Sequence, residues 1–310
     1  MKTAVLLAAY NGMSFIEPLL SSLRGQTARG FTVLAQDDGS TDGTSERISA
    51  FAAEDTRFSA GSEQGKHLGA AGNFISLMRQ TDADLALLCD QDDIWRPEKI
   101  ETLQKAMLDA EHAYGSGCPL LVHSDSTVID GNGQTVFESL FRHQGWDPAA
   151  VELRRLLVQN NVTGCTVMIN RPLIDLVAEH ADPRRVRFHD WFIAQTAAAF
   201  GHIVFVPQPL VMYRQHTDNA IGASAGTQFS RGVGSLSRAG KARQRIALTY
   251  DTATMLRAAY GALMPRGAAE TVDAYLATRG MSKLARVLKV QRMGCTMQSA
   301  ITRAGQLLYG

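Results

Sequence analysis

Cysteines are few in this sequence, and long apolar runs are absent. The four cysteines among its 310 residues lie far apart, without a CxxC pair or a regular spacing (Cys89, Cys118, Cys165 and Cys295). This scatter argues against a disulfide framework or a structural zinc site and fits a reducing cytosol. No apolar stretch approaches the length of a transmembrane helix, so we do not expect the chain to span a bilayer. The N-terminal run MKTAVLLAAYNG predicts a first strand rather than a signal peptide, because its apolar core is short.

Acidic residues are scarce in one part of the chain. Residues 231–310 contain 13 Lys and Arg but 3 Asp and Glu, whereas residues 1–230 contain 18 and 27. A basic segment of this kind usually contacts something anionic, either an external partner or the acidic part of the same protein. Nucleic acid is excluded as the partner, because the most regular basic stretch, residues 281–295, has no aromatic side chain to stack on bases.

The first 130 residues alternate between strand and helix patterns. Ser14 and Glu17 form a capping-box pattern that predicts the start of a helix, and Pro97 predicts the start of another. Such alternation indicates βαβ units, so we predict an α/β fold with a mostly parallel mixed sheet and functional groups at the carboxyl ends of its strands. The predicted strands are residues 3–9, 31–38, 57–61 and 85–89.

The pattern changes after residue 130. Gly131-Asn132-Gly133 predicts a hairpin, residues 162–170 a strand and residues 189–200 a helix. Pro207 and Pro209 predict a bent pair of strands, and the chain looks helical from residue 231 onward. We therefore predict a catalytic domain over residues 1–230 and a basic helical region over residues 231–310.

Polar or acidic clusters end three of the predicted strands. They are Tyr10-Asn11-Gly12, Asp37-Asp38-Gly39-Ser40 and Asp90-Gln91-Asp92-Asp93. In an open α/β sheet such ends converge on one site. Carboxylates packed this closely repel one another unless a cation neutralises them. The pattern therefore favours a hard divalent cation with oxygen ligands, Mn²⁺ or Mg²⁺, that also contacts a substrate diphosphate.

Two other functions fit parts of this pattern. Asp90-Gln-Asp92 loosely matches the nucleophile loop of haloacid-dehalogenase-type phosphatases, in which one Asp is phosphorylated. That loop normally follows the first strand of its fold, whereas two or three predicted strands precede Asp90 here. A non-catalytic module that binds nucleotide sugars is the third alternative.

Several motifs, in this order, resemble family 2 inverting glycosyltransferases with the GT-A fold over about residues 1–220. They are LLAAYNG, QDDGSTDGT, CDQDDIWRPEKI, HDWF and YRQHTDN. DQDDIW and HDW also resemble the members that transfer rhamnose or related sugars onto bacterial surface polysaccharides. The resemblance implies a metal-dependent transfer from a nucleoside-diphosphate donor, such as dTDP-rhamnose or a UDP-sugar. It also implies a polysaccharide or lipid-linked glycan as acceptor.

The resemblance implies roles for individual residues. Asp190 would be the catalytic base, while Asp92 and His216 would hold the metal. Asp93, His189, Trp191 and Arg214 are secondary candidates, and His189 stands where many relatives have Glu. The residues implied to line the nucleotide site are Ala9, Tyr10, Asn11, Asp38, Lys66, Asn73, Asp90 and Gln91.

Sugar transfer with inversion, whatever the family, requires a carboxylate within hydrogen-bond distance of the attacking acceptor hydroxyl. Asp190 opens the predicted helix of residues 190–200, so we expect the helix N-terminus to keep its carboxylate ionised. The alternative interpretation is an ordinary helix N-cap, a frequent position for Asp.

Residues 281–295 predict a basic amphipathic helix. Basic side chains recur at three-residue steps, with apolar side chains on another face, a form that suits an anionic membrane surface. Packing on the catalytic domain or on the partner in a homo-oligomer is the alternative. The resemblance adds a motive, since acceptors for such enzymes are often carried on polyprenyl lipids at the cytoplasmic face of the inner membrane. The basic residues are Lys283, Arg286, Lys289 and Arg292, reinforced by Arg238, Lys241, Arg243 and Arg245.

Overall fold

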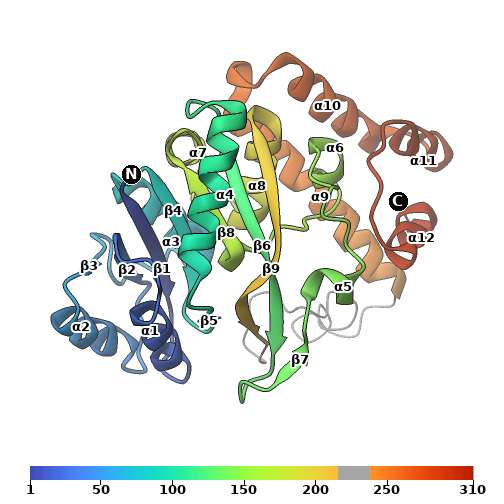
Figure 1. Ribbon diagram of the computed structural model, residues 1–310. Helices are drawn as coiled ribbons and strands as arrows, with labels where there is room; N and C mark the ends of the chain where they lie inside the picture. Colours follow the sequence, from blue (N-terminus) through green and yellow to red (C-terminus); the bar gives the residue numbers. More distant parts are fainter. Residues whose placement is uncertain (216–237, 310) are drawn as a thin grey trace.

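A computed structural model describes residues 1–215 and 238–309 (Figure 1). One mixed sheet forms its centre, with strand order β3-β2-β1-β4-β8-β6-β9-β5 and β7 paired to β6. The strands are β1 (Thr3–Ala9), β2 (Phe31–Asp37), β3 (Phe58–Ala60), β4 (Leu85–Asp90), β5 (Ile94–Trp95), β6 (Leu120–Ile129), β7 (Thr135–Phe137), β8 (Val167–Asn170) and β9 (His202–Arg214). The helices are α1 (Ile16–Arg24), α2 (Thr44–Glu54), α3 (Gly69–Gln80), α4 (Lys99–Tyr114), α5 (Leu140–Gln144), α6 (Leu153–Leu156), α7 (Arg171–His180), α8 (His189–Phe200), α9 (Arg238–Tyr260), α10 (Arg266–Ala277), α11 (Lys283–Arg292) and α12 (Ala300–Tyr309).

Parallel pairing joins β3, β2, β1 and β4, as the βαβ pattern predicts. β8 is antiparallel to both β4 and β6, while β6 and β9 are parallel. The mixed α/β sheet is therefore confirmed, with a larger antiparallel part than predicted.

Alternating side chains of the central strands supply two cores, one on each face of the sheet. Leu6 of β1 packs in one core with Phe74 of α3 and Phe192 of α8. Val5 of the same strand packs in the other core with residues of α1 and α4. This period of two places helices on both faces and leaves the strand ends free for chemistry.

Two local predictions are wrong. Ser14 does not cap α1, because the helix begins at Ile16 after a turn in which the Gly12 carbonyl accepts the N–H groups of Phe15 and Ile16, both at 2.9 Å. The predicted bent pair of strands is one strand, β9. Its pairing with β6 shifts register on either side of Asp125, near the prolines that cannot donate to the ladder.

The C-terminal helices share a core with the catalytic part. Tyr260 of α9 is buried and stacks on Phe192 of α8 with ring centroids 5.9 Å apart, and its hydroxyl lies 3.0 Å from Thr196 Oγ1. The predicted boundary at residues 230 and 231 lies outside the described residues and stays a prediction. Within residues 1–215 and 238–309, no helix combines the length and apolar character needed to cross a bilayer.

Candidate active site at the strand ends

The three predicted clusters lie side by side. Parallel register sets Ala9 of β1 opposite Asp37 of β2, and Ala8 opposite Asp90 of β4. The chain after each of these strands therefore leaves the sheet at one edge, which confirms the predicted convergence.

Side chains then tie the three loops together. The Gln91 amide donates from Nε2 to the Tyr10 carbonyl and accepts the Tyr10 N–H at Oε1, both at 2.7 Å. Asn11 has a positive φ of 49°, donates its N–H to Ser40 Oγ at 2.8 Å and accepts the Thr41 N–H at 2.9 Å. Tyr10 is 51% exposed, and its ring makes a T-shaped contact with the His67 ring, so part of its side chain is accessible to a ligand.

The two acidic residues after β2 organise backbone. Asp37 accepts the N–H groups of Gly39 and Ser40 at 3.0 and 2.8 Å, which shapes the turn. Asp38 is buried and accepts the N–H groups of Leu68 and Gly69 at 2.5 and 2.7 Å, at the start of α3. Both Asp38 oxygens thus already accept protein donors, and the place of Asp38 in the nucleotide site stays a prediction.

The remaining predicted nucleotide contacts are dispersed. Lys66 is exposed and pairs with Glu63 at 2.8 Å. Asn73 is buried on α3 and donates to the Gln36 carbonyl at 3.1 Å, and the side chain of Ala9 is also buried. Among these three residues, Lys66 alone has an accessible polar group.

Burial and mutual repulsion both raise the pKa values of the acidic cluster after β4. Burial, followed by the charges of Asp93, Asp92 and Asp190, raises the pKa of Asp90 well above its ordinary value. Burial and the charge of Asp92 raise the pKa of Asp93 to about 7. Asp190, from distant α8, therefore lies close enough to Asp90 for their charges to interact, which unites the predicted base with the predicted metal motif.

A buried lysine lies beside this cluster. Lys99, at the start of α4, is fully buried, donates to the Cys165 carbonyl at 2.6 Å and places Nζ 3.1 Å from the centroid of the Trp95 ring. Burial lowers the pKa of Lys99 to about 8, against the opposing effect of nearby anionic groups that include Asp93 and Asp90. Lys99 thus supplies one positive charge next to the carboxylates.

The carboxylates after β4 offer oxygen ligands of the kind that a hard divalent cation prefers. Ligand atoms of Asp90, Asp93 and Cys165 lie within 4.8 Å of one another. Burial raises the pKa of the Cys165 thiol well above its ordinary value, and sulfur is a soft ligand that Mg²⁺ and Mn²⁺ do not prefer. Asp93 is fully buried and accepts the Arg214 N–H at 3.0 Å. The partly exposed carboxylates, Asp90 and Asp92, are therefore better placed for a cation that retains water or substrate ligands.

Asp190 is surrounded by hydrogen-bond donors and does not cap its helix. We call the donors from Asn160, Gly164 and Trp191 the Asp190 cradle. The N-cap of α8 is Phe188, so the N-cap interpretation of Asp190 is wrong. Burial raises the pKa of Asp190 to about 6, opposed by hydrogen bonds from the Trp191 and Gly164 backbones and the Asn160 side chain. The carboxylate is therefore more basic than the helix N-terminus alone predicts, and this strengthens it as a proton acceptor.

The neighbours of Asp190 pack inward. The centroids of the His189 and Phe74 rings lie 4.2 Å apart. Burial lowers the pKa of His189 to about 3, so the imidazole is neutral at pH 7. A Cβ at Gly164 would lie 2.8 Å from His189 Nε2, so only glycine fits there. Trp191 is buried and donates from Nε1 to the Leu156 carbonyl at 2.5 Å, which identifies it as a core residue.

Arg214, one of the secondary candidates, joins two loops through hydrogen bonds. It is buried, and its guanidinium donates to the carbonyls of Asp92, Asp130 and Gly131 at 2.8, 3.2 and 3.0 Å. It therefore fixes the backbone of the acidic motif. His216, the other predicted metal ligand, lies outside the described residues.

Sequence reasoning missed Lys99, Asn160 and Gly164. The spacing of Lys99 contained a signal, because it precedes Leu103 and Met107 at four-residue steps on the buried face of α4. Asn160 and Gly164 lie far from Asp190 in sequence, and no local pattern connects them.

Three comparisons place this geometry among known proteins. The chain is 26% identical over 231 residues to the dTDP-rhamnosyl transferase RfbG of Shigella flexneri, covering 70% of this chain and 74% of that protein. The structure of S. aureus TarS 1-349 with UDP-GlcNAc has a TM-score of 0.62 at 16% identity and covers 100% of this chain and 89% of that chain, although a longer TarS chain is covered over 44% of its length. The mannosyltransferase PcManGT of Pyrobaculum calidifontis, with GDP-Man and Mn²⁺, has a TM-score of 0.54 at 16% identity, covering 99% of this chain and 87% of that chain.

The structural similarities show a common fold, the GT-A type predicted from the motifs. A family model described as "Glycosyl transferase family 2" matches residues 4–176, more than half of the chain. The chain therefore belongs to glycosyl transferase family 2.

Proposed function

We propose that this glycosyltransferase moves a sugar, with inversion, from a nucleoside-diphosphate donor to a hydroxyl of a glycan acceptor, and that Asp190 is the base. One observation carries the proposal. Asp190 of α8 lies near enough to Asp90 of β4 for its charge to raise the pKa of Asp90, although 100 residues separate them in sequence. A base and a diphosphate site must lie this close, because the attacked carbon lies between them.

Different side chains of the candidate active site would accept the proton, bind the nucleotide and hold the cation. Asp190 accepts the proton of the acceptor hydroxyl, and its cradle aims the carboxylate. The exposed side chain of Tyr10 stacks on the nucleotide base. Hydrogen bonds of the Asn11 and Gln91 side chains fix the loops next to Tyr10. Asp92, with Asp90, would hold Mn²⁺ or Mg²⁺. The cation would supply charge relief on the departing diphosphate as a Lewis acid.

The relatives suggest the finer specificity. Similarity to the dTDP-rhamnosyl transferase of Shigella suggests dTDP-rhamnose as the donor of this chain. Similarity to the structure of TarS with UDP-GlcNAc suggests a UDP-sugar. We propose a polysaccharide or a lipid-linked glycan as the acceptor. We also propose that the enzyme acts at the cytoplasmic face of the inner membrane. Membership of this enzyme family replaces the phosphatase and non-catalytic alternatives. In addition, the acidic motif follows β4 rather than the first strand that the phosphatase loop requires.

A binding screen combined with one substitution tests the proposal. Thermal shifts with dTDP-, UDP- and GDP-sugars, with and without Mn²⁺, should reveal one preferred donor whose binding needs the cation. Asp190→Asn should keep donor binding and lose about 10²–10⁴-fold in turnover, because the amide cannot accept a proton. Asp109→Asn, an exposed change on α4, is the matched control. Near-normal turnover of Asp190→Asn would reject the base, and metal-independent binding would reject the cation.

A further inference from the structure

Apolar side chains on the last two helices are exposed rather than packed. Leu284 and Leu288, one turn apart on α11, are 72% and 45% exposed. Ile301 and Leu308, two turns apart on α12, are 86% and 59% exposed. We name these four residues, with Lys289 and Arg292 of α11, the α11–α12 surface. The two helices are joined by a hydrogen bond from Lys283 Nζ to the Leu308 carbonyl at 2.5 Å.

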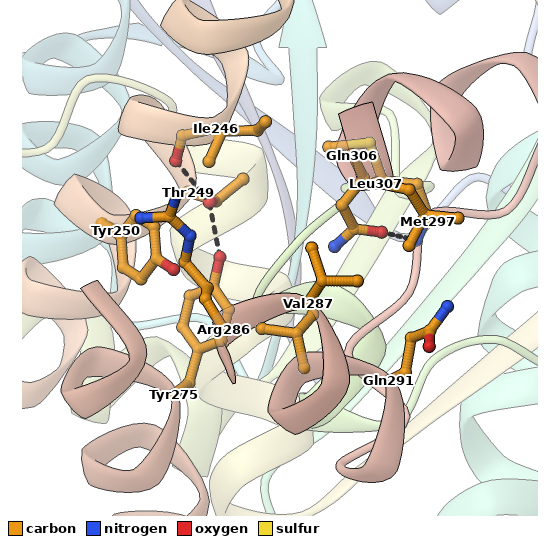
Figure 2. A pocket seen from close by; sticks show the side chains of 11 residues that line it. Ile246, Thr249, Tyr250, Tyr275, Arg286, Val287, Gln291, Met297, Gln306 and Leu307 are labelled. Carbon is orange, nitrogen blue, oxygen red and sulfur yellow. Dashed lines mark hydrogen bonds between the residues drawn. The ribbon is translucent and has the colours of Figure 1, made fainter. Parts of the chain in front are cut away.

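The inward face of α11 is already occupied. Figure 2 shows Arg286 and Val287 directed toward a pocket that α9, α10 and α12 also line. Val290, one turn after Arg286, is buried in the main core. The exposed leucines therefore lie on the opposite side of the helix, where the described part of the chain does not cover them.

The charge around these exposed apolar side chains has one sign. Residues 274–310 contain six Lys and Arg and no Asp or Glu. Lys289, Arg292 and Arg303 make no ion pair with any residue in 1–215 or 238–309. The C-terminal helices do pack on the catalytic part, as the alternative predicted, but these three basic side chains take no part in that packing through ion pairs.

Hydrogen bonds without a carboxylate partner attach this region. Arg155 donates to the Thr296 carbonyl at 3.2 Å. Gln298 accepts the Asp147 N–H at Oε1 and donates its own N–H to Gln159 Oε1, both at 2.7 Å. These contacts involve the turn between α11 and α12. They fix both helices while leaving their outer faces uncovered.

We propose that the α11–α12 surface binds the surface of an anionic lipid bilayer. Leucine and isoleucine side chains would enter the interfacial layer, while lysine and arginine approach the lipid phosphates. Each basic group near such a surface strengthens binding by about fivefold, and the attraction weakens as salt screens it. The inference is independent of the proposed reaction, because the surface shares no residue with the candidate active site.

Sedimentation of the full chain with vesicles tests this directly. The wild type should bind phosphatidylcholine vesicles that contain phosphatidylglycerol at low salt. Binding should weaken at high salt and be minimal with phosphatidylcholine alone. Lys289→Glu with Arg292→Glu should weaken binding by at least about 25-fold, from two lost basic groups. Leu284→Ser with Leu288→Ser should also weaken it without any change in charge.

The matched control reverses two exposed basic residues elsewhere, Arg29→Glu with Lys105→Glu, and should retain binding. Melting curves confirm that all variants fold, as expected for changes at exposed positions. Failure of the wild type to bind anionic vesicles at low salt overturns the proposal, and so does equal loss in the control. A wild-type dimer that becomes monomeric in the leucine variant overturns it in favour of a second copy. Transfer to a soluble acceptor should be unaffected, so the outcome stays separable from that of the proposed reaction.

Discussion

The side chain of Gln91 completes the pairing of β1 with β4 beyond the end of their ladder. The last paired residues are Ala8 and Asp90, and Gln91 then bonds both backbone groups of Tyr10 at 2.7 Å. A Cβ at Gly12 would lie 2.3 Å from the Gln91 side chain, so the absence of a side chain there makes room for the amide. Gln91 therefore fixes the position of Tyr10 relative to the acidic motif.

Gln91→Ala should weaken nucleotide binding and also lower stability. Two hydrogen bonds within the protein disappear, each contributing about 1 kcal/mol to stability, and Tyr10 is no longer fixed beside the acidic motif, so we expect affinity for the donor nucleotide to fall about tenfold. Calorimetric titration measures this. Gln104→Ala removes one hydrogen bond to Thr3 at the opposite end of β1 and should leave affinity unchanged.

Gly12→Ala provides a second view of the same contact. Its methyl group would displace the Gln91 amide, so its effect on affinity should match that of Gln91→Ala and not add to it. Full additivity in the double variant would contradict the role assigned to Gln91.

Separate functions for Asp92 and Asp93 are the second prediction. Asp92→Asn should remove most cation-dependent nucleotide binding, because a partly exposed carboxylate is lost. Asp93→Asn should leave that binding largely intact, because Asp93 is buried and accepts the Arg214 N–H. Titration of the nucleotide with and without Mn²⁺ distinguishes the two. The assignment fails if Asp93→Asn abolishes the metal dependence and Asp92→Asn does not.

Local patterns predicted the elements well but not the contacts between them. The run before Asp90 and the glycines after Asp37 specify strand and turn by their own chemistry. Parallel pairing then brings their ends together. The Ser14 cap failed because a nonlocal contact competes: Glu17, its expected partner, pairs with Arg47 of α2 at 2.6 Å. The role of Asp190 was visible from the family motif, whereas its cradle depends on a loop 26 to 30 residues earlier in the chain.

Lys99→Met should be strongly destabilising, which is the third prediction. Lys99 is a fully buried cation whose charge acts on Asp90 and Asp93, and its removal leaves these two carboxylates without that charge. Breaking such an arrangement costs about 3 kcal/mol. Denaturant unfolding at neutral pH measures the loss. Lys105→Met, an exposed change on the same helix, is the control and should cost little. Equal stability of the two variants would show that Lys99 does not offset the acidic cluster.

The last prediction links pH to the Asp190 cradle. Burial raises the pKa of Asp190 from 3.8 to about 6, so turnover should rise with pH through about 6 as the carboxylate loses its proton. The contribution of Asp190 to the free energy of unfolding changes with pH in the opposite direction. The folded state binds the proton more tightly than the unfolded state, so this contribution is present below about 3.8 and is lost as pH rises through about 6. Asp190→Asn should abolish both dependences.

Asn160→Ala tests the cradle itself. Its hydrogen bond favours the ionised carboxylate, so its loss should raise the pKa of Asp190 further and shift the acid limb of the pH–rate profile upward. A hydrogen bond to a charged group contributes about 1.5 kcal/mol, which corresponds to about one pH unit. Gln159→Ala, which removes a neighbouring hydrogen bond to Gln298, should leave the limb in place. A structural role alone would lower turnover equally at every pH, so an unshifted profile in Asn160→Ala would show that Asn160 does not act on the base.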